Sequence, residues 1–363
     1  MVAYIGDLAV RKRGWLSAES FKDGVALCQT IPGATAMQST AYVGLKAGGF
    51  RGAAAAYVGF CLPAFVVMLV LSVLYQLGNQ APLVLSLFAG LRAVVVALMA
   101  NAVINFGRTT LKTWLGLPVI AGAAAALYFG VNPIYVIFAA AAAGLALPHE
   151  SGNPATAAPK SSGESRQSSY LRPLVVMLAG AAVIMALLVL RRDLFDLALT
   201  MLRVDLFAFG GGFAAIPLMQ HEVVDVHRWI PAQSFIDGIA LGQVTPGPIV
   251  ITATFVGYLF AGVGGAVVAT AAIFLPSFSI LVLVEPYFSR FKRNRYFRRA
   301  IAGILLSFVG LILAVTVQLG ASVTWEIWSI VLAVFAFAAL RLKIDILWVI
   351  VAGGVVSVLA GLP

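Results

Sequence analysis

The sequence predicts an all-α integral membrane protein built from two homologous helical repeats of inverted topology. The chain has 363 residues, of which 61% are hydrophobic and only 10% charged, whereas a soluble domain carries about a quarter charged residues. Long apolar runs fill most of its length, and one polar, helix-breaking motif occurs once in each half. Because about 20 apolar residues span a bilayer, we expect roughly 10–13 membrane segments, some of them broken or re-entrant.

Nine apolar runs are candidates for membrane helices. They cover residues 53–74, 83–104, 115–128, 131–147, 174–190, 263–284, 301–317, 327–340 and 346–362. Most approach the length that a bilayer requires. Cys28 and Cys61 have no metal-binding or redox spacing and are expected to be small buried residues.

An internal duplication defines the two repeats. Residues 15–33 (WLSAESFKDGVALCQTIPG) return as residues 229–247 (WIPAQSFIDGIALGQVTPG) at an offset of 214. Matches continue at an offset of 213, where Pro63 corresponds to Pro276 and Gly90 to Gly303. Chance would give roughly one or two identities over such a stretch, so the halves are homologous.

The expected organisation is a first repeat over 1–148, a polar linker over 149–171 and a second repeat over 172–363. The linker is rich in Ser, Pro and Gly and is predicted to be flexible and solvated. Met1 aligns with Ala215, so the first repeat lacks the helix that precedes this position in the second. Either the protein is shortened or its start was assigned at an internal methionine; we favour the second explanation.

Loop charges indicate that the repeats are inverted. The loop 76–82 has no charge, whereas its counterpart after the Pro276 span is basic. The basic residues there are Arg290, Lys292, Arg293, Arg295, Arg298 and Arg299. By the positive-inside rule the two loops lie on opposite sides of the membrane. Topology therefore explains the net charge of +10 without a nucleic-acid partner, and a multi-pass protein of the inner (plasma) membrane is expected.

The Pro-Gly breaks are the main candidates for a binding site. They contain Gln29, Thr30, Pro32 and Gly33 in the first repeat and Gln243, Thr245, Pro246 and Gly247 in the second. Proline breaks a helix, and freed backbone groups in a bilayer must be buried in protein or face a water-filled cavity.

The helix that starts after each break offers free N–H groups and a positive dipole to an anion. Hydroxyl donors are expected from Thr30, Thr245, Thr252 and Thr254. The alternative is a structural kink satisfied by neighbouring helices. Loop charges do not decide whether the motif crosses the membrane or re-enters.

A triple glycine, Gly210, Gly211 and Gly212, is a further candidate. Glycine permits unusual backbone conformations, and successive N–H groups in such a conformation form an anion-binding nest. Close helix packing is the alternative, since small residues favour it in membranes.

Four charged residues are candidates for coupling. Asp23 and Asp237 are paired by the duplication, and a carboxylate in a membrane segment is costly and often carries protons. They are equally well explained as helix-stabilising carboxylates near the interface. Arg92 offers a fixed positive charge but corresponds to Leu305, and Glu222 is expected at the interface.

Arg203 and Asp205 are interpreted as a local ion pair or an interfacial anchor. The three histidines, His149, His221 and His227, have no metal-binding spacing, and no nucleotide-binding or hydrolase motif occurs. We therefore expect no enzyme activity, no metal and no cofactor.

Three segments of the second repeat together resemble the chromate ion transporter family in its long, two-domain form. They are FGGG at 209–212, QVTPGP at 243–248 and GYLFAG at 257–262. The resemblance implies a membrane exporter of chromate that confers resistance, with sulfate as a related or competing anion. The FGG block is absent from the first half.

The expected function is therefore secondary transport of these oxyanions, as an antiporter, by alternating access. A passive anion channel and a non-transporting membrane subunit of a larger complex are the alternatives. The expected partners are the anion and the lipid bilayer, with a homodimer left open.

Overall fold

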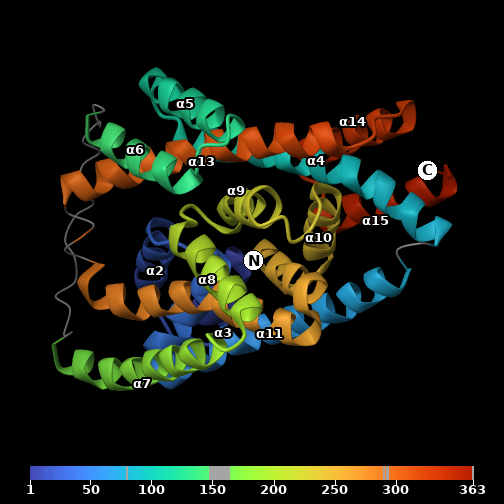
Figure 1. Cartoon of the computed structure of the whole chain (residues 1–363). Helices are drawn as coiled ribbons and strands as arrows, with labels where there is room; N and C mark the ends of the chain where they lie inside the picture. The colour runs from blue at the N-terminus through green and yellow to red at the C-terminus, as the bar shows by residue number, and fades with distance from the viewer. Residues whose placement is uncertain (79–80, 147–163, 289–290, 292–293, 362–363) are drawn as a thin grey trace.

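In the computed structural model, residues 1–78, 81–146, 164–288, 291 and 294–361 are described, and this part of the chain is helical (Figure 1). The elements are α1 (Val2–Gly6), η1 (Asp7–Lys12), α2 (Ala18–Thr30), α3 (Thr35–Gly78), α4 (Pro82–Thr110), η2 (Trp114–Gly116), α5 (Leu117–Tyr128), α6 (Pro133–Ala146), α7 (Glu164–Leu188), α8 (Arg192–Phe207), η3 (Gly212–Ala214), α9 (Ala215–Gln220), η4 (His221–Val226), α10 (Ala232–Val244), η5 (Ile249–Ile251), α11 (Thr252–Val284), η6 (Glu285–Tyr287), α13 (Arg295–Ser322), α14 (Ile327–Arg341) and α15 (Ile346–Leu359). The described residues contain no β-sheet, so the all-α class is confirmed.

The apolar runs predicted from the sequence lie in helices wherever they are described. Among the described residues, α3, α4, α11 with its flanking turns, and α13 are long and apolar enough to cross a membrane. Five apolar helices are shorter: η2 with α5, α6, the part of α7 from Arg172, α14 and α15. Residues 147–163 of the expected linker region lie outside the described residues, and its last residues, from Glu164, belong to α7.

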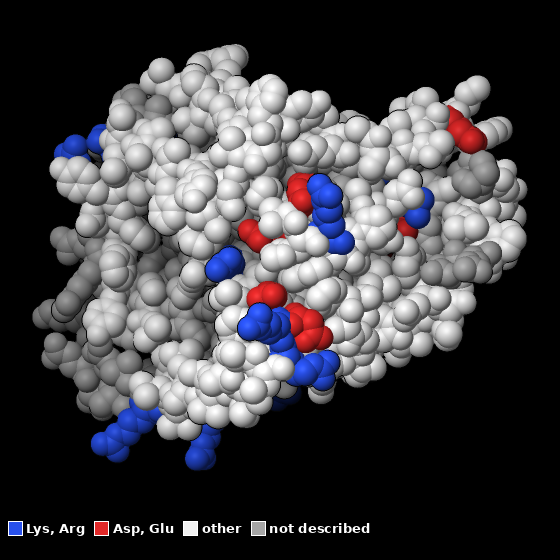
Figure 2. Space-filling view, viewed as in Figure 1, with Lys and Arg blue, Asp and Glu red and all other residues white. Residues whose placement is uncertain are grey.

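The outer surface is suited to lipid. On the face seen in Figure 2, charged residues gather near the centre and in a few smaller groups, and wide areas between them carry none. Large apolar side chains are exposed on the short apolar helices, for example Trp114, Phe129 and Ile327. Exposed apolar surface of this extent is unfavourable in water and favourable in a bilayer.

The duplication is visible in the backbone. Helix α3 is interrupted at Gly48 (φ −135°, ψ 20°) and Gly49 (φ 64°, ψ −154°). Helix α11 is interrupted at Ala261 (φ −142°, ψ 29°) and Gly262 (φ 63°, ψ −152°), 213 residues later. The same pair of dihedral angles therefore bends both helices, and a left-handed second residue explains why glycine occurs there twice.

Each bend turns the chain back on itself. A Cβ built on Gly44 would overlap the backbone of Gly52, and one built on Gly257 would overlap the backbone of Gly265. These paired glycines let the two arms of each bent helix touch through their backbones, as small residues do in membrane helix packing. Helices α3 and α11 thus have a short first arm (residues 35–47 and 252–260) and a long second arm.

The repeated motif forms a helical hairpin in each half. In hairpin 1, α2 lies against the first arm of α3: a Cβ on Gly24 would overlap the Tyr42 ring. Gly33 stands midway in sequence between these two residues, at the turn of the hairpin. In hairpin 2, α10 lies against η5 and the first arm of α11, where a Cβ on Gly242 would lie 2.9 Å from Thr252 Oγ1. Gly247 stands midway in sequence between these two residues, at the turn of the hairpin. We call residues 31–34 tip 1 and residues 245–248 tip 2.

The length of the hairpin arms bears on whether the motif crosses the membrane or re-enters. Helices α2 and α10 have 13 residues each, which corresponds to about 20 Å at the α-helical rise. The hydrocarbon core of a bilayer is about 30 Å thick. Each hairpin arm is shorter than this thickness and the chain turns back at each tip, which favours re-entry of the motif over a crossing.

The repeats run in opposite directions. Helices α4 and α13 are equivalent in the duplication and pack antiparallel, because Gly107 lies beside Val309 at one end and Val96 beside Gly320 at the other. The long arms of α3 and α11 also cross antiparallel, because Phe50 lies beside Phe278 and, further along α3, Tyr57 lies beside the earlier residue Phe274, with ring centroids 5.7 and 6.2 Å apart. Inverted topology is thus a property of the packing as well as of the loop charges.

The two halves exchange their last helices. Helix α4 packs against α14 and α15 of the second half, and α13 packs against α5 and α6 of the first (Figure 1). The contacts are related by the duplication: Gly90 touches Ser357, and Gly303 touches Gly144, each residue being 213 positions from its counterpart. The halves consequently form one interlocked body.

Candidate functional site

Three chain breaks lie close together inside this body, because the triple-glycine loop touches hairpin 1 at its tip and hairpin 2 at Ile249, the residue that follows tip 2. Tip 1 is tied to the loop by a β-bridge between Pro32 and Phe209 and by the Gly33 N–H, which donates to Ala208 O at 2.9 Å. A Cβ on Gly211 would lie 3.6 Å from Thr35 Oγ1 of hairpin 1. One on Gly212 would lie 2.9 Å from Ile249 Cγ2, so the loop touches both hairpins.

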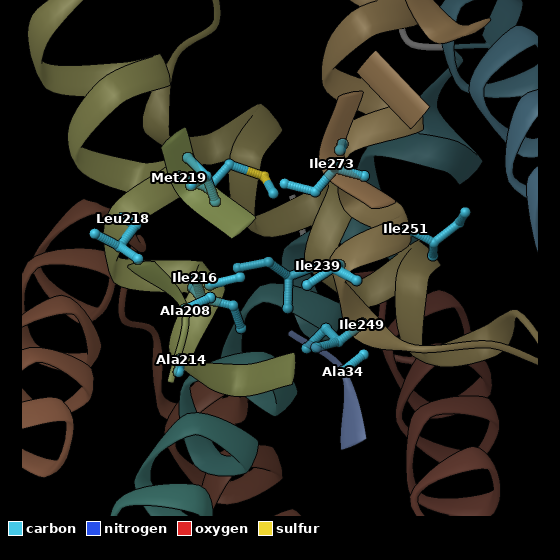
Figure 3. Packing of buried hydrophobic residues seen from close by; sticks show 14 of the residues in the cluster. Ala34, Ala208, Ala214, Ile216, Leu218, Met219, Ile239, Ile249, Ile251 and Ile273 are labelled. Atoms are coloured by element: carbon cyan, nitrogen blue, oxygen red, sulfur yellow. The ribbon is translucent and has the colours of Figure 1, made fainter. Parts of the chain in front are cut away.

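Apolar side chains support this meeting point. Figure 3 shows Ala34 of tip 1, Ala208 and Ala214 beside the glycine loop, and Ile249 of hairpin 2 within one buried cluster. All four are buried. Apolar packing therefore holds the breaks in place. Their backbone N–H and C=O groups remain available for hydrogen bonds.

Backbone conformation explains the glycines at the site. Gly210 and Gly211 have φ values of 95° and 106°, and Gly33 has a φ of 114°. Side-chain-bearing residues adopt such values only with strain. Gly210 and Gly211 therefore take conformations that favour glycine, while an anion-binding nest at this loop stays a prediction.

Each tip rests on the other half of the molecule. A Cβ on Gly33 would overlap Ser277 Cβ, and a Cβ on Gly247 would lie 2.5 Å from Ala64 Cβ. Ser277 and Ala64 are duplication counterparts, and each directly follows the proline inside its long helix, Pro276 or Pro63. Movement of one half relative to the other would therefore shift both tips.

Two helix starts face this region. Helix α3 begins at Thr35, and η5, which leads into α11, begins at Ile249. The first N–H groups of a helix have no intrahelical acceptor and carry a partial positive charge. The glycine loop touches the first residue of both helices, so both helix starts lie beside this loop.

The threonine hydroxyls are already used, contrary to the expectation from the sequence. Thr30 Oγ1 donates to Leu27 O and Thr245 Oγ1 to Gly242 O, both at 2.8 Å. Thr252 Oγ1 donates to Ile249 O at 2.8 Å. These hydroxyls cap or brace the ends of their own helices, which a polar side chain in an apolar setting does readily.

Thr254 follows the same pattern. Its hydroxyl lies 2.7 Å from Thr270 Oγ1, which itself donates to Ala266 O at 2.6 Å. Thr254 must therefore be the donor of the pair. The donors left at the breaks are backbone N–H groups and amide side chains.

The two motif glutamines differ. Gln243 is half-buried, and its Nε2 is buried with no hydrogen-bond partner among the described residues. Gln29, its counterpart, is exposed. A buried amide donor without an acceptor is costly and is commonly explained by a ligand or water.

Thr35 and Gln38 are residues of the site that the sequence argument missed. Gln38 is fully buried; its Nε2 donates to Pro32 O, and its Oε1 has no partner among the described residues. Thr35 faces Gly211. Their position in the first turn after the break is the signal that would have found them, since that turn carries the free N–H groups.

The charged candidates are arranged differently from the expectation. Arg92 pairs with Asp237 through two hydrogen bonds of 2.7 and 2.8 Å, and Tyr75 Oη donates to the same carboxylate at 2.9 Å. The guanidinium is thus not free for an anion. Asp237 lies eight residues before Thr245, about 12 Å along the helix, so this pair braces hairpin 2 against the first half.

The remaining candidates lie apart from this pair. Asp23 is half-buried, unlike its fully buried counterpart Asp237. Glu222 is nearly buried, with its Oε2 3.7 Å from His227 Nε2. His227 also stacks on Trp229.

The expectation that Asp205 forms a local ion pair with Arg203 or an interfacial anchor is wrong. Asp205 forms no ion pair with Arg203, which is exposed. Instead its side chain is fully buried, and its Oδ2 accepts the Ser277 N–H at 2.7 Å, beside the Pro276 break. Residues two apart on a helix do not face each other, which explains the error.

Comparison with known proteins agrees with this architecture. A family model described as chromate transporter matches residues 1–145 and 195–358. An uncharacterized transporter of Methanocaldococcus jannaschii is 38% identical over 96% of this chain and 87% of its own length. The chromate transport protein of Pseudomonas aeruginosa is 29% identical over 95% of this chain and 84% of its own.

A probable chromate transport protein of Synechococcus elongatus is 29% identical over 88% of this chain and 79% of its own. No solved structure matches the chain. The family model matches two separate regions, one in each half of the chain, as expected for a repeat. The chain therefore belongs to the chromate transporter family, a family of multi-pass membrane transporters.

Proposed function

We propose that this protein is a secondary transporter that exports chromate, and sulfate as a related anion, by alternating access and so confers chromate resistance. The observation that carries the proposal is that the triple-glycine loop touches the residue that follows each tip, with Gly211 beside Thr35 and Gly212 beside Ile249. Chromate and sulfate are both tetrahedral dianions, so donors that fit one accept the other.

Electrostatics support an anion at this meeting point. The starts of α3 and of η5 present N–H groups and positive dipole ends, as broken helices do in other secondary transporters. The buried Nε2 of Gln243 adds a donor without a partner among the described residues. No carboxylate belongs to either tip or to the glycine loop, and the Oδ2 of Asp205, three residues before Ala208, accepts the Ser277 N–H.

The interlocked inverted halves support alternating access. Each tip leans on the long helix of the other half, at Ser277 for tip 1 and at Ala64 for tip 2. Tip 1 is buried at all four residues, whereas Pro246 of tip 2 is exposed. Rocking of the halves would close one tip as it opens the other.

The test is uptake of labelled chromate by everted membrane vesicles that contain the full chain. We expect accumulation above vesicles without the protein, competition by sulfate, and dependence on an imposed ion gradient. A hydrogen bond to a charged group is worth about 1.5–3 kcal/mol, so Gln243→Ala should lower kcat/KM by roughly tenfold or more.

Gln29→Ala is the matched control, because the same residue stands at the equivalent position but is exposed. Equal effects of the two substitutions would contradict the proposed site. Absence of accumulation by the wild-type protein would contradict the function. Conductance in planar bilayers without any counter-ion dependence would identify a passive anion channel instead.

A further inference from the structure

Among the residues that the structure describes, two carboxylates are completely buried, and they are stabilised differently. Asp205 and Asp237 both have side chains with 0% exposure. Asp237 is neutralised by Arg92 and also accepts from Tyr75. Asp205 accepts the Ser277 N–H, has no ion-pair partner among the described residues, and its Oδ1 has no hydrogen-bond partner there.

This difference favours a protonated Asp205 far more than a protonated Asp237. An ionised carboxylate buried without a cation is costly, and the neutral acid avoids most of that cost. A carboxylate held by a bidentate guanidinium stays ionised, because protonation would leave the arginine unpaired. Of the two, only Asp205 is placed to gain and lose a proton.

Few charged or titratable groups around Asp205 would oppose its protonation. Tyr57 is the titratable side chain nearest in the network: its hydroxyl lies 2.7 Å from Ser277 Oγ and donates to Phe274 O at 2.9 Å. Arg203 is exposed, and Asp193 and Asp196 are exposed at the other end of α8. Within the described parts of α7, α9 and α11, no charged side chain pairs with Asp205.

Asp205 is also attached to the candidate site from two directions. Its hydrogen-bond partner Ser277 packs against Gly33 of tip 1. Three residues beyond Asp205, Ala208 O accepts the Gly33 N–H, and Phe209 bridges to Pro32. The Asp205 carboxyl thus links the two segments that support tip 1, namely Ser277 on α11 and residues 208–209 after α8.

We propose that Asp205 is a proton-binding site that couples proton movement to the position of tip 1. This deepens the proposed transport function and rests on it. The protonated carboxyl can stay buried beside the Ser277 N–H, so tip 1 keeps its support on α11. Loss of the proton leaves a buried negative charge without a cation, which favours movement of tip 1 that exposes the carboxylate to water.

The proton balance is simple. One proton is taken from the aqueous phase on one side when tip 1 opens, is held on the carboxyl, and is released to the other side. No bond of the transported anion changes. In the present conformation the carboxyl is closed off, because its exposure is 0%, so the exchange of the proton is limited to states in which tip 1 has moved.

The experiment compares wild type, Asp205→Asn and Asp193→Asn in proteoliposomes. Asp193 is the control, since it makes the same chemical change on the same helix but at an exposed position. Under a pH gradient, wild type and Asp193→Asn should accumulate labelled chromate. Asp205→Asn should lose at least tenfold of this accumulation while retaining exchange of labelled for unlabelled chromate. Gradient-driven accumulation by Asp205→Asn at the wild-type level would overturn the proposal.

A second readout needs no transported anion. Infrared spectra of the purified full chain should show the C=O stretch of a protonated carboxyl that disappears as the pH is raised. This band should shift in Asp205→Glu, vanish in Asp205→Asn and persist in Asp193→Asn. A wild-type protein without such a band refutes the proton site even if Asp205→Asn does not fold. A band without chromate flux in wild type refutes the transport function and leaves the proton site standing.

Discussion

The two re-entrant hairpins share a sequence motif and a backbone, yet their side chains are used differently. Tip 1 is buried and bridged to Phe209, whereas tip 2 is exposed at Pro246. Asp237 is fully buried against Arg92, whereas Asp23 is half-buried, and Leu305 stands at the position equivalent to Arg92. Duplication has kept the residues that shape the backbone and changed the residues that hold each hairpin to its neighbours.

That asymmetry has a physical basis. Proline and glycine at the tips and glycines at the bends set φ and ψ, and any replacement changes the path of the chain. A polar side chain on the flank of a helix only needs a partner, and the partner can come from any element nearby. Two inverted hairpins with identical contacts would have equally stable tips. Hairpins 1 and 2 have different contacts, so their tips are not equivalent.

The largest expected difference between the hairpins concerns their aspartates. Asp237→Ala leaves Arg92, whose side chain is 21% exposed, without its partner, and breaking a buried ion pair costs about 3–5 kcal/mol. Asp23→Ala should cost under about 1 kcal/mol, as for partly exposed charges. Thermal unfolding of the purified proteins measures both.

The double variant Arg92→Ala, Asp237→Ala tests the cause of this effect. It should be more stable than Asp237→Ala alone, because no unpaired guanidinium remains. A double variant that is no better than the single one would show that Asp237 stabilises the protein by other means.

The tip glycines should differ by a smaller amount. Gly33→Ala meets both a positive φ and an overlap with Ser277, so we expect a loss of about 2–4 kcal/mol. Gly247→Ala meets only Ala64 Cβ at 2.5 Å and has no positive φ, which predicts about 1–2 kcal/mol. Denaturation midpoints that reverse this order would mean that tip 2 is the more tightly held.

The smallest effect concerns the bend shared by α3 and α11. Gly48→Ala should be neutral or stabilise by about 0.5 kcal/mol, because alanine restricts the unfolded chain. Its counterpart is already an alanine, Ala261, with nearly the same φ and ψ, and a Cβ on Gly48 meets nothing within 4 Å. Gly262→Ala, at a φ of 63°, should instead cost about 1 kcal/mol or more. Equal melting temperatures for the two variants would argue against the shared bend.

Much of the fold was predictable from residues acting locally. Apolar runs marked the helices, the repeat offset marked the two halves, and loop charge marked their inversion. Pro32 with Gly33 and Pro246 with Gly247 located both breaks, because proline and glycine act on the backbone wherever they stand. Re-entry was not predictable, since it depends on α2 and α10 folding back onto the next arm.

Predictions about side-chain partners were less successful. Thr30 and Thr245 were expected to offer donors to an anion, but the carbonyls three residues earlier take their hydrogens. Arg92 was considered as a free cation, although Asp237 comes from a helix 145 positions away. Asp205 was interpreted as part of a local pair with Arg203 or an interfacial anchor, while its partner is the Ser277 N–H.

The sequence by itself determined the class of the protein, its helices, its duplication and the places where the backbone breaks. These follow from hydropathy, charge and the dihedral limits of proline and glycine, which each residue carries with it. Only the tertiary structure decided that both tips and the glycine loop converge, and that of two buried carboxylates one has an arginine and the other has none. Such pairings depend on which distant helices become neighbours, and in an interlocked, inverted pair those neighbours come from the other half of the chain.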